Sequence, residues 1–199
     1  MSADVPKIKG LAFIEALKWY AKMYGQPRLT EATKSLPREL ASFITQPETP
    51  HLGLLPGSWY PSKLVELIFA QLYKGMTPQQ KERLAADFAK ASIANTLTGF
   101  YATFMRMLVG PDMIAKHFQK VWQLYQSTGR CEVIVHAPMH FELRISDWPG
   151  HTQFFCDMAM FASRNVLEVI GCKNVKSTTL RCVDRRPGYC AYDLTWTMV

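Results

Sequence analysis

The sequence lacks the features that would direct it into or across a membrane. No apolar run among its 199 residues reaches the roughly 18 residues that a membrane-spanning helix needs. The first ten residues, MSADVPKIKG, lack the apolar stretch of a signal peptide, which predicts a cytoplasmic protein. Five cysteines in a cytoplasmic chain predict reduced thiols rather than disulfides.

The common signatures of enzymes and nucleic-acid binders are also absent. There is no glycine-rich phosphate loop, no nucleophile elbow and no His-Glu-x-x-His helix, which predicts a protein that is not an enzyme. Cys131 beside Arg130 could be a thiol of lowered pKa, but no base can be assigned to it. The net charge is +7, yet no basic run exceeds two residues, so a solvated basic face is favoured over a nucleic-acid partner.

The composition is that of a packed protein, with 48% hydrophobic and 12% aromatic residues. Apolar residues at helical spacing predict helices over 11–24, 29–43 and 64–73. Thr77-Pro78-Gln79-Gln80 has the pattern of a capping box, and the helix it opens can extend to Leu108 before Gly110-Pro111. The next helix carries one apolar stripe, formed by Ile114, Phe118, Val121 and Trp122.

The period of the apolar residues changes after Gly129. CEVIVHAP and FELRIS alternate as strands, a helix with Cys156 follows to about Ile170, and two more strands close the chain. This order predicts an α+β fold, with a helical bundle packed on a four-stranded sheet expected to be antiparallel. We expect a single domain over 1–199, with a helical part at 1–129 and a sheet-containing part at 130–199.

Three cysteines are expected to approach one another in the second part. Cys182 and Cys190 flank the turn of the last hairpin, and the helix that crosses the sheet carries Cys156. Thiolates that converge in this way are soft metal ligands, for which His151 or a water could be the fourth donor. The alternative is that each cysteine is a small buried hydrophobic residue.

The stretch from Glu142 to Trp196 resembles the 4-vinyl-reductase domain, which is grouped with haem–nitric-oxide-binding sensors and small subunits of the TRAPP tethering complex. The Cys156 helix, Gly171 and the pattern Cys182-x7-Cys190-x-Tyr192-x-Leu194 carry the resemblance. It implies a structural zinc held by Cys156, Cys182 and Cys190. The family's fourth ligand, a glutamate, corresponds to Thr179 here.

The whole chain also resembles a family of uncharacterised proteins that is numerous in myxobacteria. Trp59-Tyr60-Pro61, the Gly110-Pro111 break and the order of helices before sheet carry this resemblance. It implies a cytoplasmic, non-enzymatic module with an interior cavity.

His117 is a candidate haem ligand. It falls on the apolar stripe near Ile114 and Val121, and its helix resembles the proximal-histidine helix of haem–nitric-oxide sensors. Those sensors bind the haem propionates with a Tyr-x-Ser-x-Arg motif, whereas this chain has Arg144-Ile145-Ser146-Asp147-Trp148 and keeps only the serine. A core or pocket-lining histidine is therefore favoured over a haem ligand, and haem is ranked below zinc as a cofactor.

His136 and His140 form a second histidine pair, on either side of Pro138-Met139. A metal could lie between them, but exposed loop histidines are the favoured interpretation.

Aromatic residues and methionines on two consecutive helices suit a pocket for a flat apolar molecule. The residues expected to line it are Phe100, Phe104, Met107, His117, Phe118 and Trp122. The predicted function is a non-enzymatic sensor or adaptor that binds an apolar small molecule and signals through a protein partner or a homodimer. Two alternatives remain open, a haem-based gas sensor that uses His117 and a TRAPP-like tethering subunit that holds no ligand.

Overall fold

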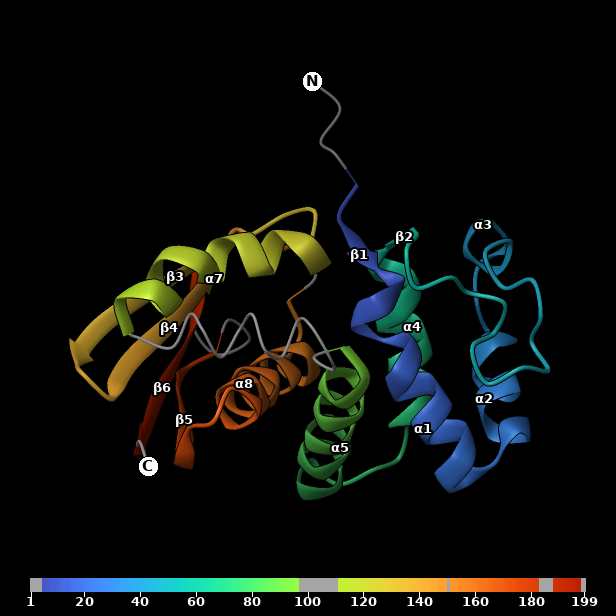
Figure 1. The fold of residues 1–199 in the computed structure, drawn as a ribbon. Coiled ribbons are helices and arrows are strands. Elements are labelled where there is room, and N and C mark those ends of the chain that lie inside the picture. Colours follow the sequence, from blue (N-terminus) through green and yellow to red (C-terminus); the bar gives the residue numbers. More distant parts are fainter. Residues whose placement is uncertain (1–4, 97–110, 150, 183–187, 198–199) are drawn as a thin grey trace.

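The computed structural model describes residues 5–96, 111–149, 151–182 and 188–197. These residues form helices and an antiparallel four-stranded sheet, which confirms the predicted α+β fold (Figure 1). None of the helices in the described ranges is long and apolar enough to cross a membrane.

The N-terminal part is helical. Its helices are a 3-10 turn at Gly10–Ala12, α1 at Ile14–Tyr24, α2 at Gln26–Thr33, α3 at Arg38–Ala41, α4 at Ser62–Leu72 and α5 at Pro78–Thr96. The single helix expected over 29–43 is divided into α2 and α3, because Pro37 has no backbone N–H to donate and disfavours helical geometry at the residue before it.

The predicted start of α5 is confirmed in atomic detail. The side chain of Gln80 accepts a hydrogen bond from the Thr77 backbone N–H at 2.8 Å, and the Thr77 hydroxyl accepts one from the Gln80 N–H at 3.3 Å. This reciprocal pair satisfies two N–H groups that have no partner inside the helix.

A two-stranded sheet was not expected from the sequence. Strand β1 at Lys7–Lys9 pairs antiparallel with β2 at Trp59–Pro61, so that Ile8 lies opposite Tyr60. Each strand has three residues, too few for a periodic pattern to be recognised. Strand β1 also lies at the C-terminal end of α7, where Ile8 bridges to Gln126.

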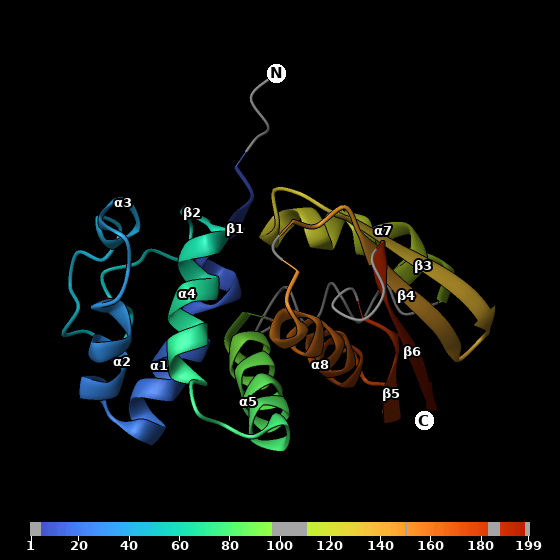
Figure 2. The same ribbon diagram turned by 180° about the vertical axis from the view of Figure 1, so that it is seen from behind.

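The second part contains the larger sheet. Its elements are α7 at Pro111–Tyr125, β3 at Arg130–Ala137, β4 at His140–Ser146, α8 at Gln153–Val169, β5 at Lys173–Arg181 and β6 at Tyr189–Thr197. The strands lie in the order β3-β4-β6-β5, so the chain crosses from β4 through α8 to the far edge before β6 returns to the centre (Figure 2).

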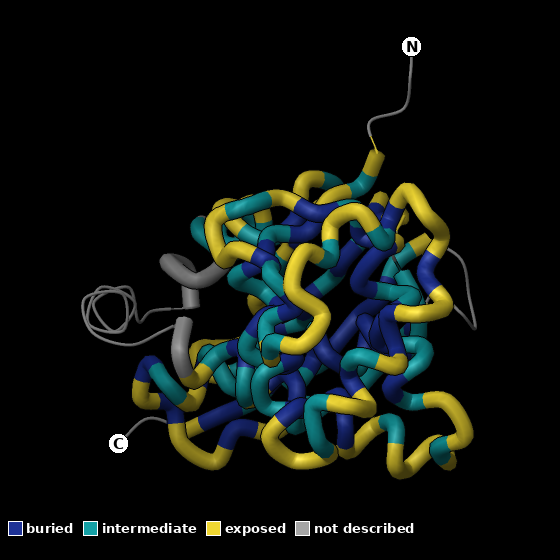
Figure 3. The backbone as a smooth tube through the Cα atoms, turned by 90° about the vertical axis from the view of Figure 1, so that its right-hand side faces the viewer, coloured by how far each residue is buried: buried dark blue, intermediate teal, exposed yellow. Residues whose placement is uncertain are grey.

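Helices α7 and α8 cover the apolar face of this sheet. Phe141, Leu143 and Ile145 alternate along β4 and are fully buried, and the Phe141 ring lies 6.2 Å from that of Phe118 on α7. Helix α5 packs on α8, and α1 packs on α5. Buried segments therefore continue from the sheet into the helical part (Figure 3).

Candidate functional site

A cavity of about 180 Å³ lies between α7, α8, the sheet and the N-terminal segment. Its walls are almost entirely apolar. Helix α8 contributes Met158, Ala159 and Val166, the sheet contributes Leu143 and Ile145, and the start of the chain contributes Ile8 and Phe13.

Helix α7 supplies one wall through side chains that recur at helical spacing. They are His117, Phe118, Val121, Trp122 and Tyr125. The imidazole of His117 is half-buried at this wall. The structure thus brings together three of the residues that the sequence assigned to a ligand pocket. The other three, Phe100, Phe104 and Met107, lie outside the described residues.

Two polar atoms on the cavity wall are buried and have no hydrogen-bond partner among the described residues. They are Nε1 of Trp148 and Oε1 of Gln126. The neighbouring Trp122 differs, because its Nε1–H donates to the Thr128 carbonyl at 2.9 Å. The described part of the wall includes no lysine or arginine.

Glycine at position 129 lets the two tryptophans lie close together. Its φ is +92°, a conformation that favours glycine, and a Cβ there would lie 3.1 Å from both Trp122 Nε1 and Trp148 Cβ. The two rings meet edge to face with their centroids 4.9 Å apart.

Cys131 is unsuited to nucleophilic chemistry. It lines the cavity from β3, and burial raises the pKa of its thiol to about 12. At neutral pH the thiol stays protonated, whereas a nucleophilic cysteine needs a thiolate. Its backbone N–H donates to Gln119 Oε1 at 2.5 Å, which fixes the start of β3 against α7.

Cys156 on α8 lies close to Cys182 and Cys190 of the last hairpin. The ligand atoms of His151, Cys156 and Cys190 lie within 4.8 Å of one another. A hydrogen bond with Cys190, burial, and the proximity of Cys182 raise the pKa of the Cys156 thiol. The Thr179 hydroxyl is directed elsewhere and donates to Met160 Sδ at 3.2 Å. Metal ligation by these cysteines stays a prediction.

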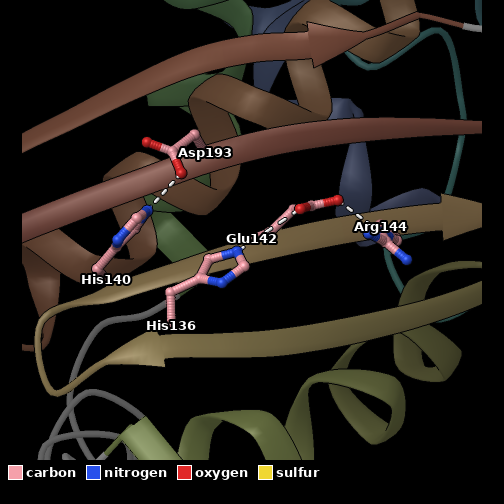
Figure 4. Close-up of polar contacts among 5 residues, drawn as sticks. All are labelled: His136, His140, Glu142, Arg144 and Asp193. Carbon is pink, nitrogen blue, oxygen red and sulfur yellow. Dashed lines mark hydrogen bonds and ion pairs between the residues drawn. The ribbon is translucent and has the colours of Figure 1, made fainter.

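His136 and His140 lie on the other face of the sheet (Figure 4). His140 Nε2 is 2.5 Å from Asp193 Oδ1, and His136 Nε2 is 3.6 Å from Glu142 Oε2. Glu142 also accepts a hydrogen bond from Arg144 Nε at 2.5 Å. Each imidazole thus has a carboxylate partner on the strands.

The sequence analysis did not identify Trp148, Gln126 or the N-terminal residues as part of the cavity. Trp148 lies in the loop between β4 and α8, and Gln126 follows the last turn of α7. Gln126 continues the spacing of the α7 stripe four residues after Trp122 but is polar, and Trp148 lies outside any periodic segment, so only their burial beside the cavity reveals them.

Comparison with known proteins gave matches at the level of structure. No family model matches the sequence, and no curated protein matches it. An H-NOX protein from S. oneidensis in the Fe(II)NO ligation state superposes with a TM-score of 0.68, at 12% identity, over 96% of this chain and 99% of that one. An Fe(II) unliganded H-NOX protein from K. algicida gives 0.66 at 9% identity, over 96% and 98%.

A third structure is an oxygen-binding H-NOX domain related to soluble guanylate cyclases. It gives a TM-score of 0.58 at 10% identity over 92% of each chain. The ranking of zinc above haem was wrong, because solved structures that share this fold belong to the H-NOX family, in which haem distortion has been probed. The resemblances to vinyl-reductase, TRAPP and myxobacterial proteins stay predictions. Over nearly its whole length, the chain has the fold of H-NOX domains.

Proposed function

We propose that the chain is a sensor module that binds haem in the cavity, with His117 as the axial ligand. One observation carries the proposal: a half-buried imidazole stands on the wall of an apolar cavity, in the fold of H-NOX domains. A neutral imidazole in such a place is a common haem ligand, and bound haem would supply iron that can take up a diatomic gas.

The side chains around His117 suit the part of a haem that surrounds the iron. The wall around His117 is apolar and aromatic, which suits a porphyrin and keeps water from the iron. The cavity of about 180 Å³ is below the roughly 300 Å³ at which pockets for drug-sized ligands begin. Haem binding therefore requires the walls to separate, and we expect it to change the near-ultraviolet circular dichroism of Trp122 and Trp148.

Haem titration of the purified chain tests the proposal. The wild-type protein should develop a Soret band with one haem per chain, and His117→Ala should lose it. The matched control is His136→Ala, which removes an imidazole from the outer face of the sheet and should bind haem like the wild type. No Soret band from wild-type protein, or an unchanged band from His117→Ala, would contradict the assignment.

A second candidate is a sensor for a small apolar molecule without haem. Its support is the cavity itself, whose size is similar to that of an engineered apolar cavity of about 150 Å³ that binds benzene. Native mass spectrometry of freshly purified protein separates the two candidates, since the released molecule would be haem or another organic compound.

In either case the proposed role is non-enzymatic. A sensor must bind its ligand more tightly in one of two states, and a partner protein or a second copy must distinguish those states. Size-exclusion chromatography and pull-downs, with and without ligand, would measure this difference. A chain that carries no ligand yet binds a partner in fixed stoichiometry would instead favour a tethering subunit.

A further inference from the structure

We infer that Trp148 and Gln126 form a head-group site, which receives the polar end of a cavity ligand as an electrically neutral group. The inference rests on the proposed function of the cavity. It adds which chemical group of the ligand binds away from His117. His117 lies nine residues before Gln126, roughly 13 Å away at the helical rise of about 1.5 Å per residue. The ligand is therefore apolar along its length and polar at this end.

The two polar atoms of the head-group site are deeply buried. Trp148 is 6% exposed and Gln126 is 8% exposed, and neither Trp148 Nε1 nor Gln126 Oε1 has a hydrogen-bond partner among the described residues. Leaving such a group unpaired costs about 1–3 kcal/mol. A pair of unpaired atoms on the wall of a cavity is the arrangement expected where a ligand completes the hydrogen bonds.

Both residues line the cavity, and each of them contacts Trp122. Gln126 donates its backbone N–H to the Trp122 carbonyl at 2.9 Å, and the Trp122 ring packs on Trp148 with centroids 4.9 Å apart. Ile8, which bridges to Gln126, lies on the same wall.

The chemistry of the two atoms defines the head group. Indole Nε1–H can only donate, and an amide oxygen accepts. One ligand group that accepts from the first and donates to the second is a hydroxyl or a protonated carboxyl.

The described part of the wall offers no cation to an ionised head group. The titratable side chains on its described part are His117, Tyr125 and Cys131. The His151 ring meets Trp148 edge to face, with centroids 4.7 Å apart. No lysine or arginine is among them, and a buried carboxylate without a cation costs several kcal/mol. A haem in this cavity would present only a protonated carboxyl to this end and would leave ionised carboxylates in water.

The test compares 2-naphthol with naphthalene, which differ by one hydroxyl group. Fluorescence or calorimetric titration of the wild-type chain should show about tenfold tighter binding of 2-naphthol, the effect of one or two neutral hydrogen bonds. Trp148→Phe removes the donor and keeps a smaller aromatic ring, and Gln126→Leu removes the acceptor and keeps most of the volume. Each should reduce the preference for 2-naphthol and leave naphthalene binding within about twofold.

Matched controls separate this role from a structural one. Trp122→Phe removes an indole N–H that already donates to the Thr128 carbonyl. Gln119→Leu removes an amide oxygen that already accepts from the Cys131 N–H. Both controls should lower the urea midpoint of the ligand-free protein. Trp148→Phe should lower it less than Trp122→Phe, because both lose ring volume but only Trp122→Phe also loses a hydrogen bond, and Gln126→Leu should leave it unchanged or raise it.

Either of two results overturns the inference. One is that the wild-type protein binds 2-naphthol and naphthalene equally tightly, or binds neither of them. The other is a loss of stability in Trp148→Phe as large as that in Trp122→Phe. Haem titration of the same samples reports on His117 separately, so a Soret band with no naphthol preference would leave the proposed function standing without a head-group site.

Discussion

The two faces of the four-stranded sheet differ in whether their polar side chains have partners. On the outer face, His140, Glu142 and Arg144 each have a charged partner within the sheet. On the inner face, the same strand contributes Leu143 and Ile145 to a cavity where Trp148 Nε1 and Gln126 Oε1 are unpaired among the described residues. Paired charges at a surface indicate a solvated structural network, whereas unpaired dipoles beside empty space indicate a place for a ligand.

The largest expected contrast is between two fully buried leucines on neighbouring strands, one that lines the cavity and one that does not. Leu143 is fully buried and lines the cavity, so Leu143→Ala should lower the free energy of unfolding by about 2–5 kcal/mol. Leu194→Ala, on the neighbouring strand and away from the cavity wall, should cost a similar amount. Urea denaturation in saturating benzene should restore more stability to Leu143→Ala, and equal recovery of the two variants would contradict a ligand-accessible cavity.

Filling the cavity should not destabilise the fold, whereas overpacking elsewhere should. Ala162→Leu on α8 points added methyl groups at the cavity, so stability should be kept and ligand binding lost. Ala16→Leu, at a fully buried site on α1, should cost about 1–3 kcal/mol and leave ligand binding unchanged. Thermal unfolding with haem titration checks both variants, and weakened stability in Ala162→Leu would mean that the space is not free.

Alkaline pH should lower the free energy of unfolding in part through Cys131. The pKa of Cys131 is raised from 9.0 to about 12 in the folded chain, so its contribution is complete below pH 9 and is lost as pH rises toward 12. The greatest slope for one such group is about 1.4 kcal/mol per pH unit. Cys131→Val should reduce this slope, measured by urea denaturation from pH 8 to about 10.5; an identical slope in both proteins would argue against a buried protonated thiol.

The smallest effects are expected on the outer face. Arg144→Ala should cost about 1 kcal/mol, because the ion pair is open to solvent on the Arg144 side, where it is screened and its side chain is ordered at an entropic cost. Its effect should diminish further in 1 M salt, where the Debye length falls to about 3 Å. A cost as large as that of Leu143→Ala would show that the network is structural after all.

Much of the fold could be predicted because it is encoded locally. The change from a helical to an alternating period after Gly129 separates the two parts, and the capping box locates the start of α5. The split at Pro37 was also visible in principle, since proline disfavours a continuous helix. The β1–β2 pair was not, because three-residue strands are defined only by their partners.

The site was less predictable, because its walls come from segments far apart in the chain. The stripe on α7 placed His117, Phe118 and Trp122 together, but periodicity shows which side chains share a face and not what lies opposite them. Ile8, Gln126 and Trp148 join that wall only through tertiary packing. The zinc ranking was wrong because it rested on the spacing of three cysteines, whereas the structural comparison rests on nearly the whole chain.

Helix α8 lies between two buried regions. Met158, Ala159 and Val166 face the cavity, while Cys156 approaches Cys190 on the last hairpin and Met160 accepts a hydrogen bond from Thr179 on β5. A ligand in the cavity that displaces α8 would change the free energy of the contacts between α8 and the hairpin. Because such coupling is reciprocal, a change at the thiols that favours one position of α8 would alter the affinity of the cavity by the same factor.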